Sequence, residues 1–284
     1  MKNISLLLFL SIMLSSATSS ASGWLTDLEQ AKKLALSTDK LILVDFWASW
    51  CGPCKRMDQE SWSDPEIQKI MQSYIPLQID IDSKKRDAMR YNVRSIPYIF
   101  IIDGNGEVIY KSLGYMNKDK VAQVLKKYAL NTGFMRNEAI GFYQHQNYVT
   151  GLRLAEKYLD YTLYLDDEVK RDFLTLAENY LKEGEKLLDK KQKNYKFMKE
   201  KVELLELTAA LYANNEKEVR KTLEKTDLEE LDPNNRSLYA YVNLCLNQKE
   251  QNTTEIEKWT ATLEEAKGSE KFFVKAKLFS GEEN

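Results

Sequence analysis

Two cysteines, Cys51 and Cys54, lie three positions apart in the segment WASWCGPCKRM of a chain of 284 residues. Three arrangements use such a pair: a structural disulfide, half of a metal site, or a redox couple that opens and closes. A disulfide across two intervening residues closes a very short loop, and short loops gain least from a cross-link. A zinc site needs about four ligands, and only Cys245 and the single histidine, His145, remain as obvious soft ligands. The pair is therefore best interpreted as a dithiol that exchanges with disulfides.

The pair is placed where a buried strand ends and a helix begins. The run LILVDFWA, residues 41–48, is apolar except for Asp45 and predicts a strand buried on both faces. The unpaired N–H groups and the positive dipole end of the following helix stabilise a thiolate at Cys51 and lower its pKa. Pro53 lacks an N–H and fits the first turn of a helix, and Gly52 leaves the first sulfur open to a partner.

The rest of the first half alternates between helix and strand. A capping box of Thr26 and Glu29 predicts a helix to about residue 37, and the hairpin residues GNG, 104–106, join two strands. Alternation of this kind predicts an α/β sheet covered by helices. The further predicted elements are strands at 75–82, 98–103 and 107–112, and helices at 84–92 and 117–130.

Beyond residue 130 the sequence changes character. Four of the five prolines precede residue 100, and only Pro233 lies beyond it. Apolar residues then recur at three- and four-residue spacing, which predicts an all-α domain over residues 131–284. The segment AEKYL at 155–159 recurs as AENYL at 177–181. This similarity suggests stacked helical hairpins, as in tetratricopeptide-like repeats, but a plain helical bundle fits the pattern nearly as well.

The N-terminus predicts export. Lys2 precedes an apolar run at residues 4–14, and small residues follow it. A helix needs roughly 20 apolar residues to span a bilayer, so residues 1–21 are interpreted as a cleaved signal peptide, with a short anchor as the alternative. The mature chain would carry no membrane span and reach the periplasm or the exterior, where disulfides persist. The net charge of −2 gives no argument for nucleic acid as a partner.

The segment LVDFWASWCGPCKRM, residues 43–57, closely resembles the active-site segment of thioredoxin. SIPY at 95–98 resembles the cis-proline loop of that family, and DGNGEVIYKSLGY at 103–115 resembles its final hairpin. The resemblance covers about residues 24–130 and is closest to exported thioredoxin-like reductase domains. It implies a thioredoxin fold, a central mixed sheet with flanking helices, over residues 22–130.

The resemblance also assigns roles to the site residues. Cys51 is implied to be the attacking thiolate and Cys54 the resolving thiol. Asp45 is implied to be a buried proton acceptor for Cys54, and burial should raise its pKa. Gln78 stands where thioredoxins commonly have a lysine beside this acid. Because Gln78 supplies no positive charge, the carboxyl of Asp45 should titrate still higher.

The same resemblance implies a substrate-binding surface around the two cysteines. The proline of the SIPY loop is implied to be cis and to face the disulfide, and Tyr98 replaces the threonine that usually follows it. No metal and no cofactor other than the Cys51–Cys54 disulfide is expected. The substrate-binding residues are Trp50, Gly52, Pro53, Ile96, Pro97 and Gly114.

The leading hypothesis is an exported thiol–disulfide oxidoreductase that reduces protein disulfides and is recharged by an unidentified thiol donor. The alternative is an interaction or client-delivery protein, whose helical domain binds a partner and whose thioredoxin-like domain is mainly a scaffold. Cys245, in the apolar segment YAYVNLCLNQ, is interpreted as a buried inert thiol. A third redox cysteine is the minor alternative.

Overall fold

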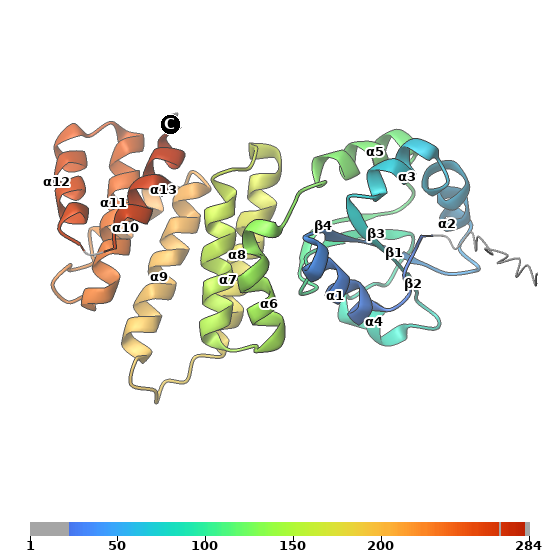
Figure 1. The fold of residues 1–284 in the computed structure, drawn as a ribbon, viewed down its shortest axis with the longest axis horizontal. Helices are drawn as coiled ribbons and strands as arrows, with labels where there is room; N and C mark the ends of the chain where they lie inside the picture. The colour runs from blue at the N-terminus through green and yellow to red at the C-terminus, as the bar shows by residue number, and fades with distance from the viewer. Residues whose placement is uncertain (1–22, 267, 282–284) are drawn as a thin grey trace, which may run out of the picture.

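The structure is a computed structural model that describes residues 23–266 and 268–281. The predicted signal peptide, residues 1–21, lies outside the described residues. Within the described ranges, no helix combines the length and the apolar character needed to cross a membrane. Figure 1 shows a mixed α/β half that contains the sheet and a half made of helices.

The sheet has four strands in the order β2-β1-β3-β4. β1 pairs in parallel with β2 and antiparallel with β3, and β4 pairs antiparallel with β3. The sheet is therefore mixed, as predicted. The strands are β1 (Leu41–Trp47), β2 (Tyr74–Asp80), β3 (Tyr98–Ile102) and β4 (Val108–Leu113).

Helices cover both faces of this sheet. Alternate residues of β1 point to opposite faces, so Ile42 and Val44 pack in one apolar cluster, and Leu41 and Leu43 in another. Asp45 continues the second series and lies on the face covered by α2, α3 and α5. The helices of this half are α1 (Leu28–Thr38), α2 (Gly52–Met57), the π-helix η1 (Asp58–Trp62), α3 (Pro65–Met71), α4 (Lys85–Arg90) and α5 (Lys118–Lys127).

The N-terminus of α1 differs from the prediction. Asp27, not Thr26, is the N-cap, and its carboxylate accepts the backbone N–H of Gln30 at 2.7 Å. Glu29 pairs instead with Lys32 at 3.1 Å. The capping-box prediction was wrong by one residue because Asp27 directly precedes the first helical residue, where its short carboxylate reaches the free N–H groups.

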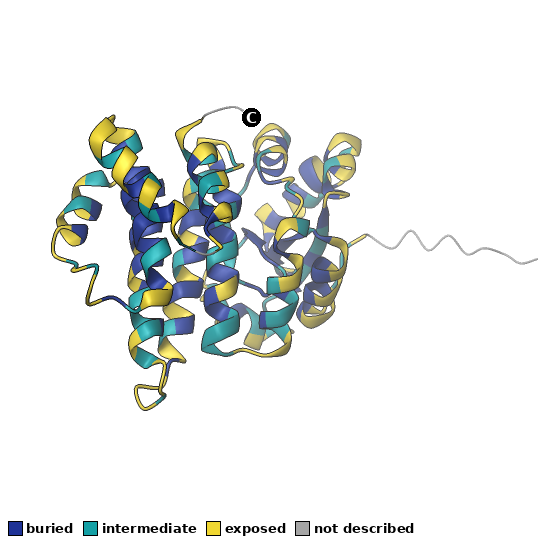
Figure 2. Cartoon of the chain, turned by 60° about the vertical axis from the view of Figure 1, so that its left-hand side comes forward, coloured by how far each residue is buried: buried dark blue, intermediate teal, exposed yellow. Residues whose placement is uncertain are grey.

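The second half consists of helical hairpins that stack side by side (Figure 1). α7 pairs with α8, α9 with α10 and α11 with α12, while α9 also packs on α7 and α11, and α13 packs on α11. Figure 2 shows that the buried sides of these helices face their neighbours. Membership of a repeat family stays a prediction. The elements are η2 (Gly133–Met135), α6 (Arg136–Gln144), α7 (Tyr148–Thr162), α8 (Asp167–Lys186), α9 (Tyr195–Tyr212), α10 (Glu216–Leu223), η3 (Pro233–Asn235), α11 (Arg236–Glu250), α12 (Thr253–Glu264) and α13 (Glu270–Ser280).

Asp103, in the turn after β3, joins the two halves. It is 1% exposed, and its Oδ1 accepts the backbone N–H groups of Asn105 and Glu107, both at 2.9 Å. Its Oδ2 accepts the hydroxyl of Tyr158 at 2.8 Å and that of Tyr180. The two tyrosine rings stack at 5.5 Å with an interplanar angle of 8°. These tyrosines occupy the same position in AEKYL and AENYL, so the similarity between the two segments corresponds to a shared contact with the sheet.

The joint lies at the end of the sheet opposite the cysteine pair. Cys51 lies in the segment between the end of β1 and the start of α2, and Asp103 directly follows the last residue of β3. Because β1 and β3 run antiparallel, these positions are at opposite ends of the sheet. The helical half therefore leaves the end that carries the cysteines uncovered (Figure 1).

Candidate active site

Cys51 caps the N-terminus of α2, and it forms a disulfide with Cys54. The backbone N–H of Cys54 donates to Cys51 Sγ at 3.2 Å. An N–H donor and the positive end of the helix both favour negative charge on that sulfur. Both cysteines are nearly buried, with exposed fractions of 3% and 2%, so static exposure alone does not distinguish them.

Three partly buried side chains pack against the disulfide: Trp47 at the end of β1, Ile81 after β2, and Ile96 before β3. They come from three separate segments, which fixes the disulfide at the C-terminal ends of two parallel strands. This is the edge where parallel α/β sheets commonly hold their ligands.

The loop before β3 contains the predicted cis proline. The Ile96–Pro97 peptide bond is cis, and the Pro97 carbonyl accepts the backbone N–H of Gly114 at 2.8 Å. Gly114 has a φ of +97°, a region that favours glycine. The structure therefore links these three predicted substrate-binding residues, and it places Ile96 against the disulfide.

The other predicted binding residues lie on the open side of the site. Gly52 and Pro53 are exposed at the start of α2. Trp50 is 65% exposed, and its Nε1 donates to Asp82 Oδ2 at 2.8 Å. A large aromatic surface held in place by one hydrogen bond is suited to contact with a partner.

Asp45 is 3% exposed beneath α2. Its Oδ2 accepts from Gln78 Nε2 at 3.3 Å, and Gln78 is its direct neighbour across β2. Its Oδ1 is buried and has no hydrogen-bond partner among the described residues. The pKa of Asp45 is raised from 3.8 to about 7, mainly by burial and also by nearby Asp58, against the lowering effects of Gln78 and Trp62. Gln78 is thus the predicted neighbour of Asp45, and the direction of the pKa shift agrees with the prediction.

Asp58 was not predicted from the sequence. Gln78 Nε2 lies 3.5 Å from Asp58 Oδ1, so one amide faces both carboxylates. Partial burial raises the pKa of Asp58. A signal was available, because Asp58 follows Cys54 by four positions on the same helical segment, and residues so spaced share a helix face.

Cys245 lies apart from this site, within α11. Its side chain is fully buried, and burial raises its thiol pKa to about 12. A thiol with so little thiolate is unreactive at neutral pH, which agrees with the interpretation as an inert residue. Within the described ranges, no cluster of three or more histidine, cysteine or acidic side chains is placed to hold a metal.

We expect Cys51, not Cys54, to be alkylated first when the reduced protein meets limiting iodoacetamide at neutral pH. The N–H of Cys54 and the start of α2 stabilise the Cys51 thiolate, which is the reactive form. Peptide mapping across pH measures the preference, and Cys245→Ser serves as the control that should leave it unchanged. Preferential labelling of Cys54 would reverse the assignment of nucleophile and resolving thiol.

Comparisons with known proteins match the first half of the chain. A family profile described as "Thioredoxin-like domain" matches residues 28–129. The thioredoxin of Chlorobaculum thiosulfatiphilum is 35% identical over 97 residues, covering 33% of this chain and 83% of that protein. The thioredoxin of Bacillus subtilis is 33% identical over 101 residues, covering 33% of this chain and 88% of that protein. Among solved structures, the reduced C-terminal domain of DsbD from Neisseria meningitidis is 25% identical, covers 36% of this chain and 93% of its own length, and has a TM-score of 0.32.

Proposed function

The chain belongs to the thioredoxin family, and on that premise we propose that it is an exported oxidoreductase that reduces protein disulfides through Cys51 and Cys54. The observation that carries the proposal is the position of Cys51 at the start of α2, with the N–H of Cys54 on its sulfur. This arrangement favours the thiolate that disulfide exchange requires.

In the first step, the Cys51 thiolate of the reduced protein attacks one sulfur of the substrate disulfide. The substrate S–S bond breaks, its other sulfur leaves as a thiolate, and that thiolate takes a proton from water. Cys51 is then joined to the substrate in a mixed disulfide. The exposed Gly52 and Pro53 allow the substrate to approach.

In the second step, Cys54 resolves the mixed disulfide. Its thiol gives a proton to the Asp45 carboxylate, and the Cys54 sulfur attacks Cys51 Sγ. The Cys51–Cys54 disulfide forms, and the substrate sulfur leaves as a thiolate. Two electrons have passed from the protein to the substrate. Asp45, with its pKa of about 7, is suited to accept and release this proton near neutral pH.

Substrate binding is proposed at the surface formed by Trp50, Ile96, Pro97 and Gly114. The cis-proline loop and the Gly114 loop are held together by the bond from Gly114 N–H to the Pro97 carbonyl. An extended substrate segment can lie along these loops and place its disulfide over Cys51. The exposed Trp50 ring borders the same surface.

The proposed direction is reduction, because the Gly-Pro pair between the cysteines supplies no extra positive charge to favour the dithiol. No cofactor other than the Cys51–Cys54 disulfide is proposed. The oxidised protein then has to be recharged by a dithiol donor. Export would place this chemistry where the substrate disulfides persist.

We expect the mature protein to accelerate the reduction of insulin by dithiothreitol, measured as the onset of turbidity. Cys245→Ser should be equally active, because Cys245 is buried outside the site. No acceleration by a folded wild-type protein would contradict the oxidoreductase proposal. Export is checked separately, because the chain recovered from outside the cytoplasm should begin near Ser22.

A further inference from the structure

Asp45 exchanges its proton near neutral pH and therefore needs contact with solvent. In the proposed function, on which this inference rests, Asp45 takes a proton from Cys54 when the disulfide forms. Cys54 needs a proton again when the donor reopens the disulfide, and between these two steps an acid with a pKa of about 7 equilibrates with the solvent. Its carboxyl is 3% exposed, and direct contact with bulk water is therefore minimal. A buried acid that turns over repeatedly depends on neighbouring polar groups to exchange its proton.

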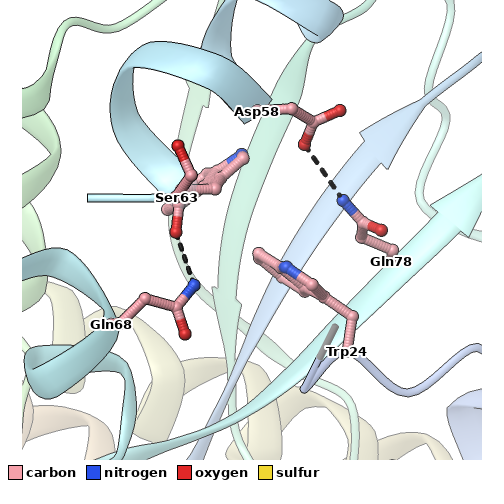
Figure 3. A pocket seen from close by; sticks show the side chains of 6 residues that line it. Trp24, Asp58, Ser63, Gln68 and Gln78 are labelled. Carbon is pink, nitrogen blue, oxygen red and sulfur yellow. Dashed lines mark hydrogen bonds between the residues drawn. The ribbon is translucent and has the colours of Figure 1, made fainter. Parts of the chain in front are cut away.

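A cavity of about 300 Å³ reaches the residues around this acid, although Asp45 itself does not line it (Figure 3). Gln78, which donates to Asp45, forms part of its wall. Figure 3 shows Asp58 and Gln78 approaching each other across the cavity. Its lining residues are Trp24, Asp58, Trp62, Ser63, Gln68 and Gln78.

Two buried polar atoms at this place are not satisfied by the protein. Asp45 Oδ1 and Trp62 Nε1 are both buried and have no hydrogen-bond partner among the described residues. Trp62 lines the cavity, and its indole N–H lies near enough to Asp45 to lower the pKa of that carboxyl, although the two atoms do not form a hydrogen bond of normal geometry. A cavity of this size is large enough for several water molecules, and unsatisfied buried polar groups are the usual partners of such waters.

The π-helix brings the remaining groups to the cavity. α2 ends at Met57, and η1 continues it from Asp58 to Trp62. Such single π turns are frequent at functional sites because they shift the side chains relative to a regular helix. Here both ends of η1, Asp58 and Trp62, line the same cavity.

We propose that Asp58 is a positioning residue that passes protons between Asp45 and solvent through this cavity. Asp58 is the only carboxyl group among the lining residues, and it is half-buried, so it reaches both the cavity and the exterior. The side-chain amide of Gln78 faces both carboxylates and connects them. Burial also raises the pKa of Asp58, which brings its proton affinity closer to that of Asp45.

The proton balance is simple. The carboxyl proton that Asp45 received from Cys54 moves along hydrogen bonds in the cavity to the Asp58 carboxylate. Asp58 then gives the proton to solvent. When the donor reopens the disulfide, the same path in reverse returns a proton to Asp45 and, through it, to the Cys54 thiolate. No electron and no covalent bond is involved in this transfer.

The test compares Asp58→Asn with Asp58→Glu and with Ser63→Ala, a matched change in the same cavity wall. In dithiothreitol-driven insulin reduction at low buffer concentration, Asp58→Asn should lose about tenfold in turnover, less than the ~100-fold typical of a directly placed acid–base group. Added formate, a small acid that fits the cavity, should restore the rate. Asp58→Glu should stay close to wild type, and Ser63→Ala should show neither the loss nor the rescue.

A second measurement needs no disulfide substrate. A stopped-flow pH jump followed by the infrared carboxyl band of Asp45, identified by its loss in Asp45→Asn, should show slower proton exchange in Asp58→Asn. Unchanged turnover and exchange, or a loss that neither formate nor Asp58→Glu recovers, would overturn the relay. A wild-type protein that exchanges the proton through Asp58 yet fails to reduce insulin would overturn the proposed function instead.

Discussion

Replacing Asp45 with asparagine is expected to stabilise the folded protein and, at the same time, to slow its disulfide exchange. The carboxyl lies beneath α2 with one oxygen lacking a hydrogen-bond partner, and its burial disfavours the charged form. Asparagine has nearly the same shape and no charge, so it removes this penalty. It cannot accept a proton from Cys54, so the resolving step should slow by about a hundredfold.

The pH dependence follows from the direction of the shift. The pKa of Asp45 is raised from 3.8 to about 7 in the folded state, so the folded protein keeps this proton to higher pH than the unfolded chain. Stability therefore falls as pH rises from 3.8 towards 7 and stays low above it. Each pKa unit corresponds to roughly 1.4 kcal/mol, which makes the full penalty on the order of 4 kcal/mol. Asp45→Asn should recover about 2 to 4 kcal/mol at pH 8 and very little near pH 4.

Urea unfolding at pH 4 and pH 8, paired with insulin reduction at pH 8, measures both effects. Asp119→Asn is the matched control, because Asp119 is an exposed acid in the first turn of α5. It should leave stability and activity nearly unchanged. An Asp45→Asn protein that is less stable and fully active would identify Asp45 as an ordinary hydrogen-bonded structural acid and end its role as proton acceptor.

Asp103→Ala is expected to destabilise the protein by about 4 kcal/mol. The substitution removes the acceptor for two backbone N–H groups and for the hydroxyls of Tyr158 and Tyr180. The two tyrosine hydroxyls lie in the buried contact between the halves, and the two N–H groups lie in the turn that carries Asp103. Each unsatisfied buried donor costs about 1 to 3 kcal/mol. The loss falls on the contact between the halves, so unfolding should change from one transition to two.

Urea unfolding followed by far-ultraviolet circular dichroism and by tryptophan fluorescence measures this change. Four of the five tryptophans precede residue 63, and only Trp259 lies in the helical half. Tryptophan fluorescence therefore reports mainly the unfolding of the first half. Tyr180→Phe removes one hydroxyl and keeps the ring stack, so it should cost only about 1 kcal/mol. Insulin reduction at low temperature should be retained in both variants, because the joint and the disulfide lie at opposite ends of the sheet. Coincident transitions and an unchanged midpoint for Asp103→Ala would show that Asp103 does not join the halves.

The sequence was most informative where chemistry and local structure coincide. The cysteine pair at a strand–helix junction, the acid within an apolar strand, and the GNG hairpin each depend on neighbours close in the chain. Their positions in β1, α2 and the β3–β4 turn are confirmed. Gln78 could be assigned as the neighbour of Asp45 only through the family resemblance, because these residues are 33 positions apart.

What the sequence did not predict depends on contacts between distant segments. Asp58 faces Gln78 across 20 positions, and Asp103 faces Tyr180 across 77. Hydrophobic periodicity indicates which face of an element is buried, but not which element covers it. The similarity of AEKYL and AENYL was visible, yet its shared tyrosine could be explained only once α7 and α8 were seen to converge on one carboxylate.

The contact at Asp103 places the helical half away from Cys51, which affects the disulfides of any partner that the helices bind. A partner held on the outer helices α11, α12 and α13 sits at the far end of the chain from Cys51 (Figure 1). Such binding raises the effective concentration of the partner's disulfide at Cys51 only when a flexible segment spans the molecule, and this gain falls roughly as the −3/2 power of segment length once the span is exceeded. A compact partner gains nothing, because its disulfide cannot reach Cys51 while the partner stays bound to these helices. An attachment at this end of the sheet would therefore favour clients with long mobile tails, independently of their sequence.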